Sequence, residues 1–305
     1  MKRKIYFAAA LVGVAFSLTA CDDNCLDPQS VITADLVEKT PLDYWLEVNY
    51  LQPYNIEIKY RYEYNETEGS FYTVPANYDD AVAMAHIVKY SCVEAYDEVA
   101  GIDFTRQYFP KMFFFEGEWH WRNNGSFELG TAEGGKKIFL MGLNYMDEYT
   151  KNLDLLNYFY LKTIHHEFTH ILNQTVEYPA SYQLITGTGY VADSWTDYPW
   201  TEGYLKRGFI SAYAQQSDEE DFAEMLSTYV TSTPEQWEAY MEEAADSVYD
   251  GGTTARDLLE SKLDIVRTYM VDNFGIDLDR LRNTVLRREQ DIIDGKIDLA
   301  DVSVD

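Results

Sequence analysis

Two histidines, His166 and His170, lie four residues apart in a segment whose apolar residues repeat at helical spacing. On a helix they project from the same face one turn apart, so both imidazoles can reach one metal ion. The neighbouring Glu167 is a carboxylate that can take a proton from a metal-activated water. The run His-Glu-Phe-Thr-His therefore predicts hydrolysis that depends on one zinc ion per chain. The alternative is a pair of ordinary histidines on a helix surface.

A catalytic zinc ion normally takes three protein ligands and leaves a position for water. The other histidines all precede His166: His86, His120 and His165. His165 has the wrong spacing to share a metal with His170, and we expect it to support or pack against the site. Six residues after His170 the chain has Val176, which cannot bind a metal. We therefore expect the third ligand to be a carboxylate from a distant segment.

The best candidate segment runs from Ser217 to Glu224. Glu220 and Glu224 lie one helical turn apart on one face, so one could bind the metal while the other supports a ligand histidine. A simpler explanation is also open, because Ser217 and Glu220 have the spacing of a capping box and the acidic face could be solvated. Spacing alone leaves open whether Glu220 or Glu224 is the ligand.

The run Glu220-Asp221-Phe222-Ala223-Glu224 resembles the Glu-x-Phe-Ala-Glu helix of gluzincin metallopeptidases. The resemblance implies that Glu220 is the third metal ligand and that Glu224 supports a ligand histidine. It also implies a role for Tyr213, seven residues before Glu220, since a tyrosine near that place in similar gluzincins donates a hydrogen bond to the oxyanion.

The chain starts with a processing signal. Three basic residues, Lys2 to Lys4, precede a short apolar run that ends at Ala20, as in a secretory signal peptide. The sequence Leu18-Thr19-Ala20-Cys21 resembles the lipobox of bacterial lipoproteins, which implies a signal over residues 1–20 and a lipid on Cys21. The acidic residues after Cys21 resemble those of surface-exported lipoproteins. We thus expect a protein that is anchored to the outer face of the outer membrane, with a polar tether over residues 21–45.

The chain is strongly acidic, with 24 basic and 52 acidic residues and a net charge of −28. Loss of residues 1–20 removes three basic and no acidic residues, which changes −28 to −31. Such a charge argues against binding nucleic acid or an anionic lipid surface, so we expect the lipid to be the sole membrane attachment. We expect the protein to be a monomer. Cys25 and Cys92 could pair or stay free.

Periodicity predicts an α+β fold. A small mixed sheet and the helix that carries His166 should form a lobe over residues 46–175, and a mostly helical lobe over 176–305 should supply Glu220. We expect strands over 55–64, 111–115 and 136–141, the last as an edge strand that can bind an extended peptide. An aromatic connection should span 174–210, and helices are expected over 79–99, 153–173, 218–231, 234–247, 254–273 and 277–294.

The lipobox, the histidine pair and the Glu220–Glu224 run together resemble a family of zinc-binding metallohydrolase lipoproteins associated with outer-membrane substrate import. The resemblance implies a zincin-like fold, a peptide or protein substrate, and a transporter with a companion lipoprotein as partners. Two alternatives stay open. One is a non-catalytic lipoprotein that binds glycan or peptide for a transporter, because 15% of the residues are aromatic. The other is a zinc hydrolase that cleaves a different amide.

Overall fold

The structure, a computed structural model, describes residues 38–67, 69–122, 127–128, 130–133, 136–248 and 252–304. The chain divides into residues 1–39 and a compact unit, Thr40–Asp305, which contains every helix and strand discussed below. The predicted signal peptide, Cys21 and Cys25 lie outside the described residues. Within the described part of the chain, none of the helices has the length and apolar character that crossing a bilayer requires.

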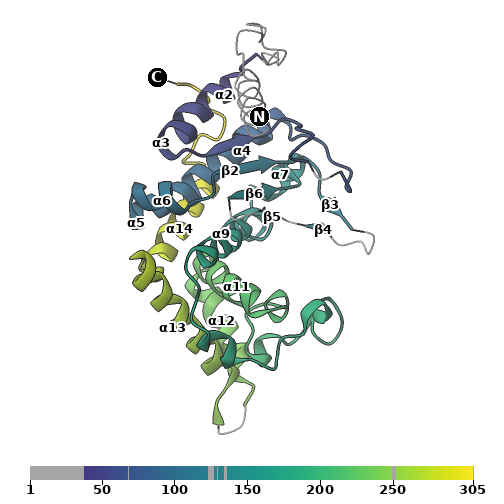
Figure 1. The fold of residues 1–305 in the computed structure, drawn as a ribbon, viewed down its shortest axis with the longest axis vertical. Helices are drawn as coiled ribbons and strands as arrows, with labels where there is room; N and C mark the ends of the chain where they lie inside the picture. Colours follow the sequence, from purple (N-terminus) through teal and green to yellow (C-terminus); the bar gives the residue numbers. More distant parts are fainter. Residues whose placement is uncertain are drawn as a thin grey trace, which may run out of the picture. The chain divides into compact units, whose positions relative to one another are not determined.

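One half of the unit contains a four-stranded mixed sheet with strand order β1-β2-β6-β5 (Figure 1). Strands β1 (Glu57–Lys59), β2 (Met112–Phe115) and β6 (Lys137–Leu140) are parallel, and β5 (Gly130–Glu133) pairs antiparallel to β6. Phe113, Phe114 and Phe115 are all buried, as expected of a strand that is covered on both faces. A separate pair, β3 (His120–Trp121) with β4 (Phe127–Glu128), lies to the right of the sheet in Figure 1.

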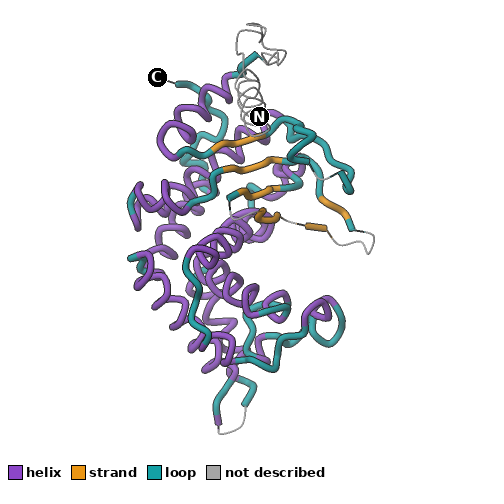
Figure 2. Tube along the Cα trace, in the orientation of Figure 1, coloured by secondary structure: helices purple, strands orange, loops and turns teal. Residues whose placement is uncertain are grey.

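The expectation that residues 136–141 form an edge strand is wrong. Strand β6 lies between β2 and β5, and the edges are β1 and β5 (Figure 2). The covering strand β5 begins with Gly130-Thr131, which lacks the apolar alternation that identifies a strand in sequence. It contacts the helix that carries His166. The first strand is also shorter than predicted and comprises only Glu57–Lys59.

Helices surround this sheet. The predicted helix over 79–99 is confirmed as a continuous rod, and so is the helix over 153–173. A helix that begins at Pro41, inside the range expected for the tether, has a capping box at Thr40. The elements of this part are α2 (Pro41–Leu46), η2 (Glu47–Leu51), α3 (Gln52–Tyr54), α4 (Tyr78–Ile87), η3 (Val88–Val93), α5 (Glu94–Ala100), α6 (Ile102–Tyr108), η4 (Leu143–Tyr145), α7 (Met146–Tyr149), α8 (Leu153–Leu156), η5 (Asn157–Leu161) and α9 (Lys162–Thr175).

The remainder is helical, and the four helices predicted after residue 217 are confirmed to within two residues at each end. Side-chain caps explain the sharp starts, at Ser217, Thr233, Thr254 and Asp277. The last helix packs against α5, on the N-terminal side of the fold (Figure 1). The elements are α10 (Ser181–Ile185), η6 (Ala192–Thr196), η7 (Leu205–Arg207), η8 (Tyr213–Gln215), α11 (Asp218–Thr231), α12 (Pro234–Ala245), α13 (Ala255–Phe274) and α14 (Leu278–Ile293).

A fully buried carboxyl lies where these helices meet. Glu289 of α14 accepts a hydrogen bond from Asn157 Nδ2 at 3.1 Å, and burial raises its pKa from 4.5 to about 8. The folded chain therefore keeps a proton that the unfolded chain releases between these two pH values. Stability from the protonated carboxyl is complete below pH 4.5 and is lost as the pH rises to about 8.

Replacement of Glu289 by Gln should remove this loss of folding stability at high pH, because the amide does not ionise. We expect Glu289→Gln to unfold with a free energy up to about 5 kcal/mol higher than the wild type at pH 8, and with a much smaller difference at pH 4.5. Urea unfolding at several pH values measures the difference. Parallel pH curves for the two proteins would show that Glu289 is ionised in the folded chain.

Candidate metal centre

Helix α9 turns one face into the core and presents the other to the site. Ile164, Phe168 and Ile171 are buried, and the Phe168 ring packs 4.9 Å from Tyr96 and 4.7 Å from Phe109, centroid to centroid. This apolar stripe fixes the rotation of the helix. As a result, His166 and His170 point away from the sheet-side core, toward α11.

Helix α11 brings the third residue. Its N-cap, Ser217, accepts a hydrogen bond from the backbone N–H of Glu220 at 3.3 Å, so the capping interaction predicted from sequence is present. Phe222, Ala223 and Leu226 are buried and pack the helix into the core. The cap involves only the backbone of Glu220, and its carboxylate is free to face α9.

Three side-chain atoms converge between the helices. Glu220 Oε2 lies 3.0 Å from His166 Nε2 and 3.2 Å from His170 Nε2, and the two nitrogens are 3.0 Å apart. Among the described residues, this is the group of His, Cys, Asp and Glu side chains whose donor atoms are close enough to hold one metal ion. Two imidazoles and a carboxylate are a ligand set typical of catalytic zinc. The residues present therefore fit a zinc ion.

Glu224 lies behind His166. Its Oε1 accepts a hydrogen bond from His166 Nδ1 at 2.9 Å, and its Oε2 accepts one from Lys162 Nζ at 2.8 Å. Burial alone would raise the pKa of Glu224, but Lys162 and His166 hold it well below its usual range. The carboxylate orients the ring so that Nε2 faces the other two donors, which is the common arrangement around zinc-bound histidines. Sequence reasoning missed Lys162, although it lies four residues before His166 on the same helix face.

The electrostatics favour a cation among the three donors. Burial lowers the pKa of His166, but its hydrogen bonds to Glu220 and Glu224 outweigh burial and raise the value to about 10. Burial raises the pKa of Glu220, whereas His166 and His170 lower it to about 2. Both carboxylates thus stay ionised, and their negative charge surrounds His166.

The two predicted catalytic side chains border this group. Glu167 is half-buried on α9, near enough to affect the pKa values of both His166 and Tyr213. Tyr213, in η8, stacks on His166 with 5.8 Å between ring centroids. The Trp195 ring packs against Tyr213 with 5.0 Å between ring centroids. Burial, and then the charge of Glu220 and a hydrogen bond to it, raise the pKa of the Tyr213 hydroxyl. The hydroxyl therefore keeps its proton at neutral pH and can donate a hydrogen bond.

His165 belongs to the core instead. It is fully buried on the other side of α9, its Nδ1 lies 3.1 Å from the Tyr96 hydroxyl, and burial lowers its pKa to about 4. The packing role expected from its spacing agrees with this position.

The acidic residues that flank Glu220 hold the aromatic connection in place. Asp218 accepts a hydrogen bond from Tyr178 at 2.8 Å. Asp221 accepts one from Tyr190 at 2.9 Å and forms a buried ion pair with Lys262 of α13 at 2.5 Å. Lys262 Nζ also donates to the backbone oxygen of Gly208 at 2.8 Å. The first turn of α11 thus supplies one member of the metal group, Glu220, and also anchors the residues that lead to Tyr213.

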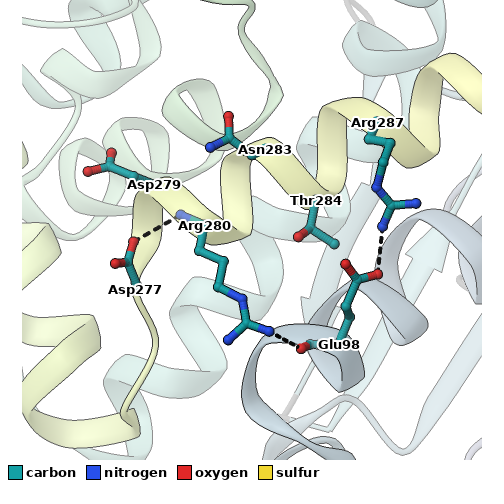
Figure 3. A pocket seen from close by; sticks show the side chains of 7 residues that line it. All are labelled: Glu98, Asp277, Asp279, Arg280, Asn283, Thr284 and Arg287. Carbon is teal, nitrogen blue, oxygen red and sulfur yellow. Dashed lines mark hydrogen bonds and ion pairs between the residues drawn. The ribbon is translucent and has the colours of Figure 1, made fainter.

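A separate surface hollow between α5 and α14 contains none of the predicted site residues (Figure 3). Arg280 donates to the backbone oxygen of Glu98, and Arg287 donates to the Glu98 carboxylate at 2.6 Å. These interactions join the two helices, so the hollow is explained by their packing.

Comparison with known proteins agrees with this geometry. Residues 35–279 match the family described as "Putative zinc-binding metallo-peptidase". The chain is also similar to the crystal structure of a putative zinc-binding metallo-peptidase from Bacteroides caccae, with 36% identity and a TM-score of 0.72 over 90% of this chain and 100% of that one. No curated protein matches the sequence. The chain therefore belongs to the family of putative zinc-binding metallo-peptidases, and its fold is mostly helical α+β with a small sheet.

Proposed function

We propose that this protein is a zincin-like, gluzincin-type peptidase that hydrolyses peptide bonds at a zinc ion held by His166, His170 and Glu220. The observation that carries the proposal is the convergence of these three donor atoms from two helices, within 3.2 Å of one another. Peptide as the substrate class rests on the family to which the chain belongs.

Each side chain has a defined task in this proposal. When bound, zinc supplies the Lewis acidity that activates water and polarises the substrate carbonyl. Glu167 takes the proton from the attacking water and passes it to the leaving amine. Tyr213, protonated at neutral pH, donates a hydrogen bond to the carbonyl oxygen as negative charge develops there. Glu224, itself held by Lys162, keeps the His166 ring in the orientation that the site needs.

Zinc content tests the assignment of the ligands. We expect about one zinc per chain in the wild type, because catalytic sites of this ligand set bind one ion. Glu220→Ala should lose zinc, since it removes a donor. Glu224→Gln should keep the ion with an affinity reduced by about 10- to 100-fold, because it only disturbs the support of His166.

Elemental analysis after dialysis and competition with a chelator measure both effects. The matched control is Glu219→Gln, an exposed acid on the same turn of α11. If Glu224→Gln loses the ion and Glu220→Ala retains it, the third ligand is Glu224. A wild type that binds no zinc at neutral pH would refute the proposed function.

We also propose that Cys21 carries a lipid that anchors the protein to the bacterial outer membrane, near an import transporter and its companion lipoprotein. The support for this is the lipobox-like run that ends at Cys21. In a bacterial host, Cys21→Ala should move the protein from the membrane fraction to the soluble fraction and abolish labelling with palmitate. Cys25→Ala, four residues later, is the control and should do neither. Equal labelling of both variants would contradict the anchor.

A further inference from the structure

Six aromatic rings, here called the aromatic cluster, come together from β3, β4, α7, η5 and the residue that precedes β3. Its members form a continuous series of ring contacts. The distances between ring centroids are 4.9 Å for Trp121 and Phe127, 5.0 Å for Phe127 and Trp119, 5.4 Å for Trp119 and Phe159, 4.0 Å for Phe159 and Tyr149, and 4.9 Å for Phe159 and Tyr158. Trp121 and Tyr158 are 52% and 58% exposed, and Phe127, Tyr149 and Phe159 are half-buried. The cluster is thus an aromatic surface between β3–β4 and α7–η5.

The cluster is continuous with the proposed catalytic helix. Phe159 lies in η5, which leads directly into α9. Thr163, Glu167 and His170 follow it at intervals of three or four residues, and all of them are half-buried. These three residues therefore lie on one face of α9, and strand β5, which begins two residues after β4, contacts the same helix. Phe159 precedes Glu167 by eight residues, which corresponds to about 12 Å along the helix.

The indole N–H of Trp121 is used within the protein. Glu118 accepts hydrogen bonds from the Trp121 indole N–H at 3.3 Å and from the Tyr145 hydroxyl at 2.8 Å. It also accepts one from the backbone N–H of Trp119 at 2.9 Å. What Trp121 offers to a ligand is therefore the face and edge of its ring. An aromatic side chain of a peptide packs favourably on exposed aromatic rings, in stacked or edge-to-face pairs.

We propose that the aromatic cluster is a specificity subsite that binds an aromatic side chain of the peptide substrate. An extended peptide advances about 3.3 Å per residue, so a distance of about 12 Å corresponds to three or four residues from the cleaved bond. The enzyme should thus select peptides with Phe, Tyr or Trp at that separation. This inference rests on the proposed peptidase activity.

Cleavage-site profiling tests the subsite. Zinc-loaded full-length protein is incubated with a mixed peptide library, and the products are sequenced by mass spectrometry. We expect an aromatic residue to be enriched about three or four positions from the cleaved bond. For matched peptides with Phe or Ala at that position, Trp121→Ala should lower the ratio of the two kcat/KM values, Phe over Ala, about 10-fold. Tyr64→Ala, an exposed tyrosine outside the cluster, is the control and should change neither.

The outcomes separate this inference from the proposed function. Cleavage without any aromatic preference would overturn the subsite and leave the peptidase intact. Absence of cleavage would overturn the peptidase. In that case, calorimetry with the zinc-loaded Glu167→Gln variant and the same Phe and Ala peptides decides the subsite, and equal affinities would overturn it.

Two other occupants would also be recognised. Loss of a wild-type dimer on Trp121→Ala, with unchanged specificity, would assign the surface to a second copy of the chain. Binding of a neutral oligosaccharide that is abolished by the same substitution, without any peptide preference, would assign it to a glycan.

Discussion

Glu167→Gln should lower peptide hydrolysis by about 10²- to 10⁴-fold, the usual contribution of a general base. The amide has nearly the shape of the carboxylate but cannot accept the proton of the attacking water. Zinc content should stay unchanged, because Glu167 is absent from the group of three donor atoms. Steady-state kinetics on a cleaved peptide, together with elemental analysis of the same preparation, measure both quantities.

Loss of kcat with KM retained would place Glu167 in the chemical step. Glu219→Gln is the control, since this exposed acid is one residue from Glu220 and should leave kcat unchanged. If Glu167→Gln were as active as the wild type, another group would be the base. If neither protein turned over any amide while both bound glycan or peptide, the non-catalytic binding lipoprotein would be the better account.

The second large effect concerns stability. Lys262→Met should reduce the free energy of unfolding by about 3–5 kcal/mol, because it leaves the Asp221 carboxylate buried without its cation. Both side chains are fully buried, and burial raises the pKa of Asp221 and lowers that of Lys262, so each group depends on the other to remain charged. Urea unfolding monitored by tryptophan fluorescence measures the change.

Matched variants test whether the uncompensated charge of Asp221 causes the loss of stability. Lys262→Met combined with Asp221→Asn should recover part of the loss, since the amide carries no charge to be compensated. Lys206→Met removes a lysine from a surface pair, with Asp246 at 3.7 Å, and should cost less than about 1 kcal/mol. A Lys262→Met protein as stable as the Lys206→Met protein would show that Asp221 is protonated in the folded chain.

The helices could be predicted because their signals are local. Ser217, the acidic first turn and the buried stripe that follows determine α11, and its predicted bounds, 218–231, agree with the structure. The histidine pair on α9 is equally local, since one turn of helix suffices to align it. Even Glu220 could be proposed from its own short segment once the histidines lacked a third partner.

Contacts between distant segments could not be predicted. Nothing near Asp221 in sequence indicates that it pairs with Lys262, because the two meet only when α13 packs beside α11. Strand β5 escaped detection because Gly130 and Thr131 carry no pattern, and its place at the sheet edge is set by pairing with β6. The aromatic cluster likewise joins Trp121 and Phe159 from separate elements. Aromatic residues are frequent in this sequence, so their presence alone does not indicate which of them meet in the fold.

The sequence separation within the metal group has a consequence for the whole chain. His170 and Glu220 are 50 residues apart, and the aromatic connection lies between them. An ion shared by the two helices is a reversible cross-link that closes this long loop and disfavours the open, unfolded chain. It also binds the folded state selectively, so stability should rise with the logarithm of the free zinc concentration. The protein's resistance to heat and to proteolysis within residues 174–217 would then report how much zinc its surroundings contain.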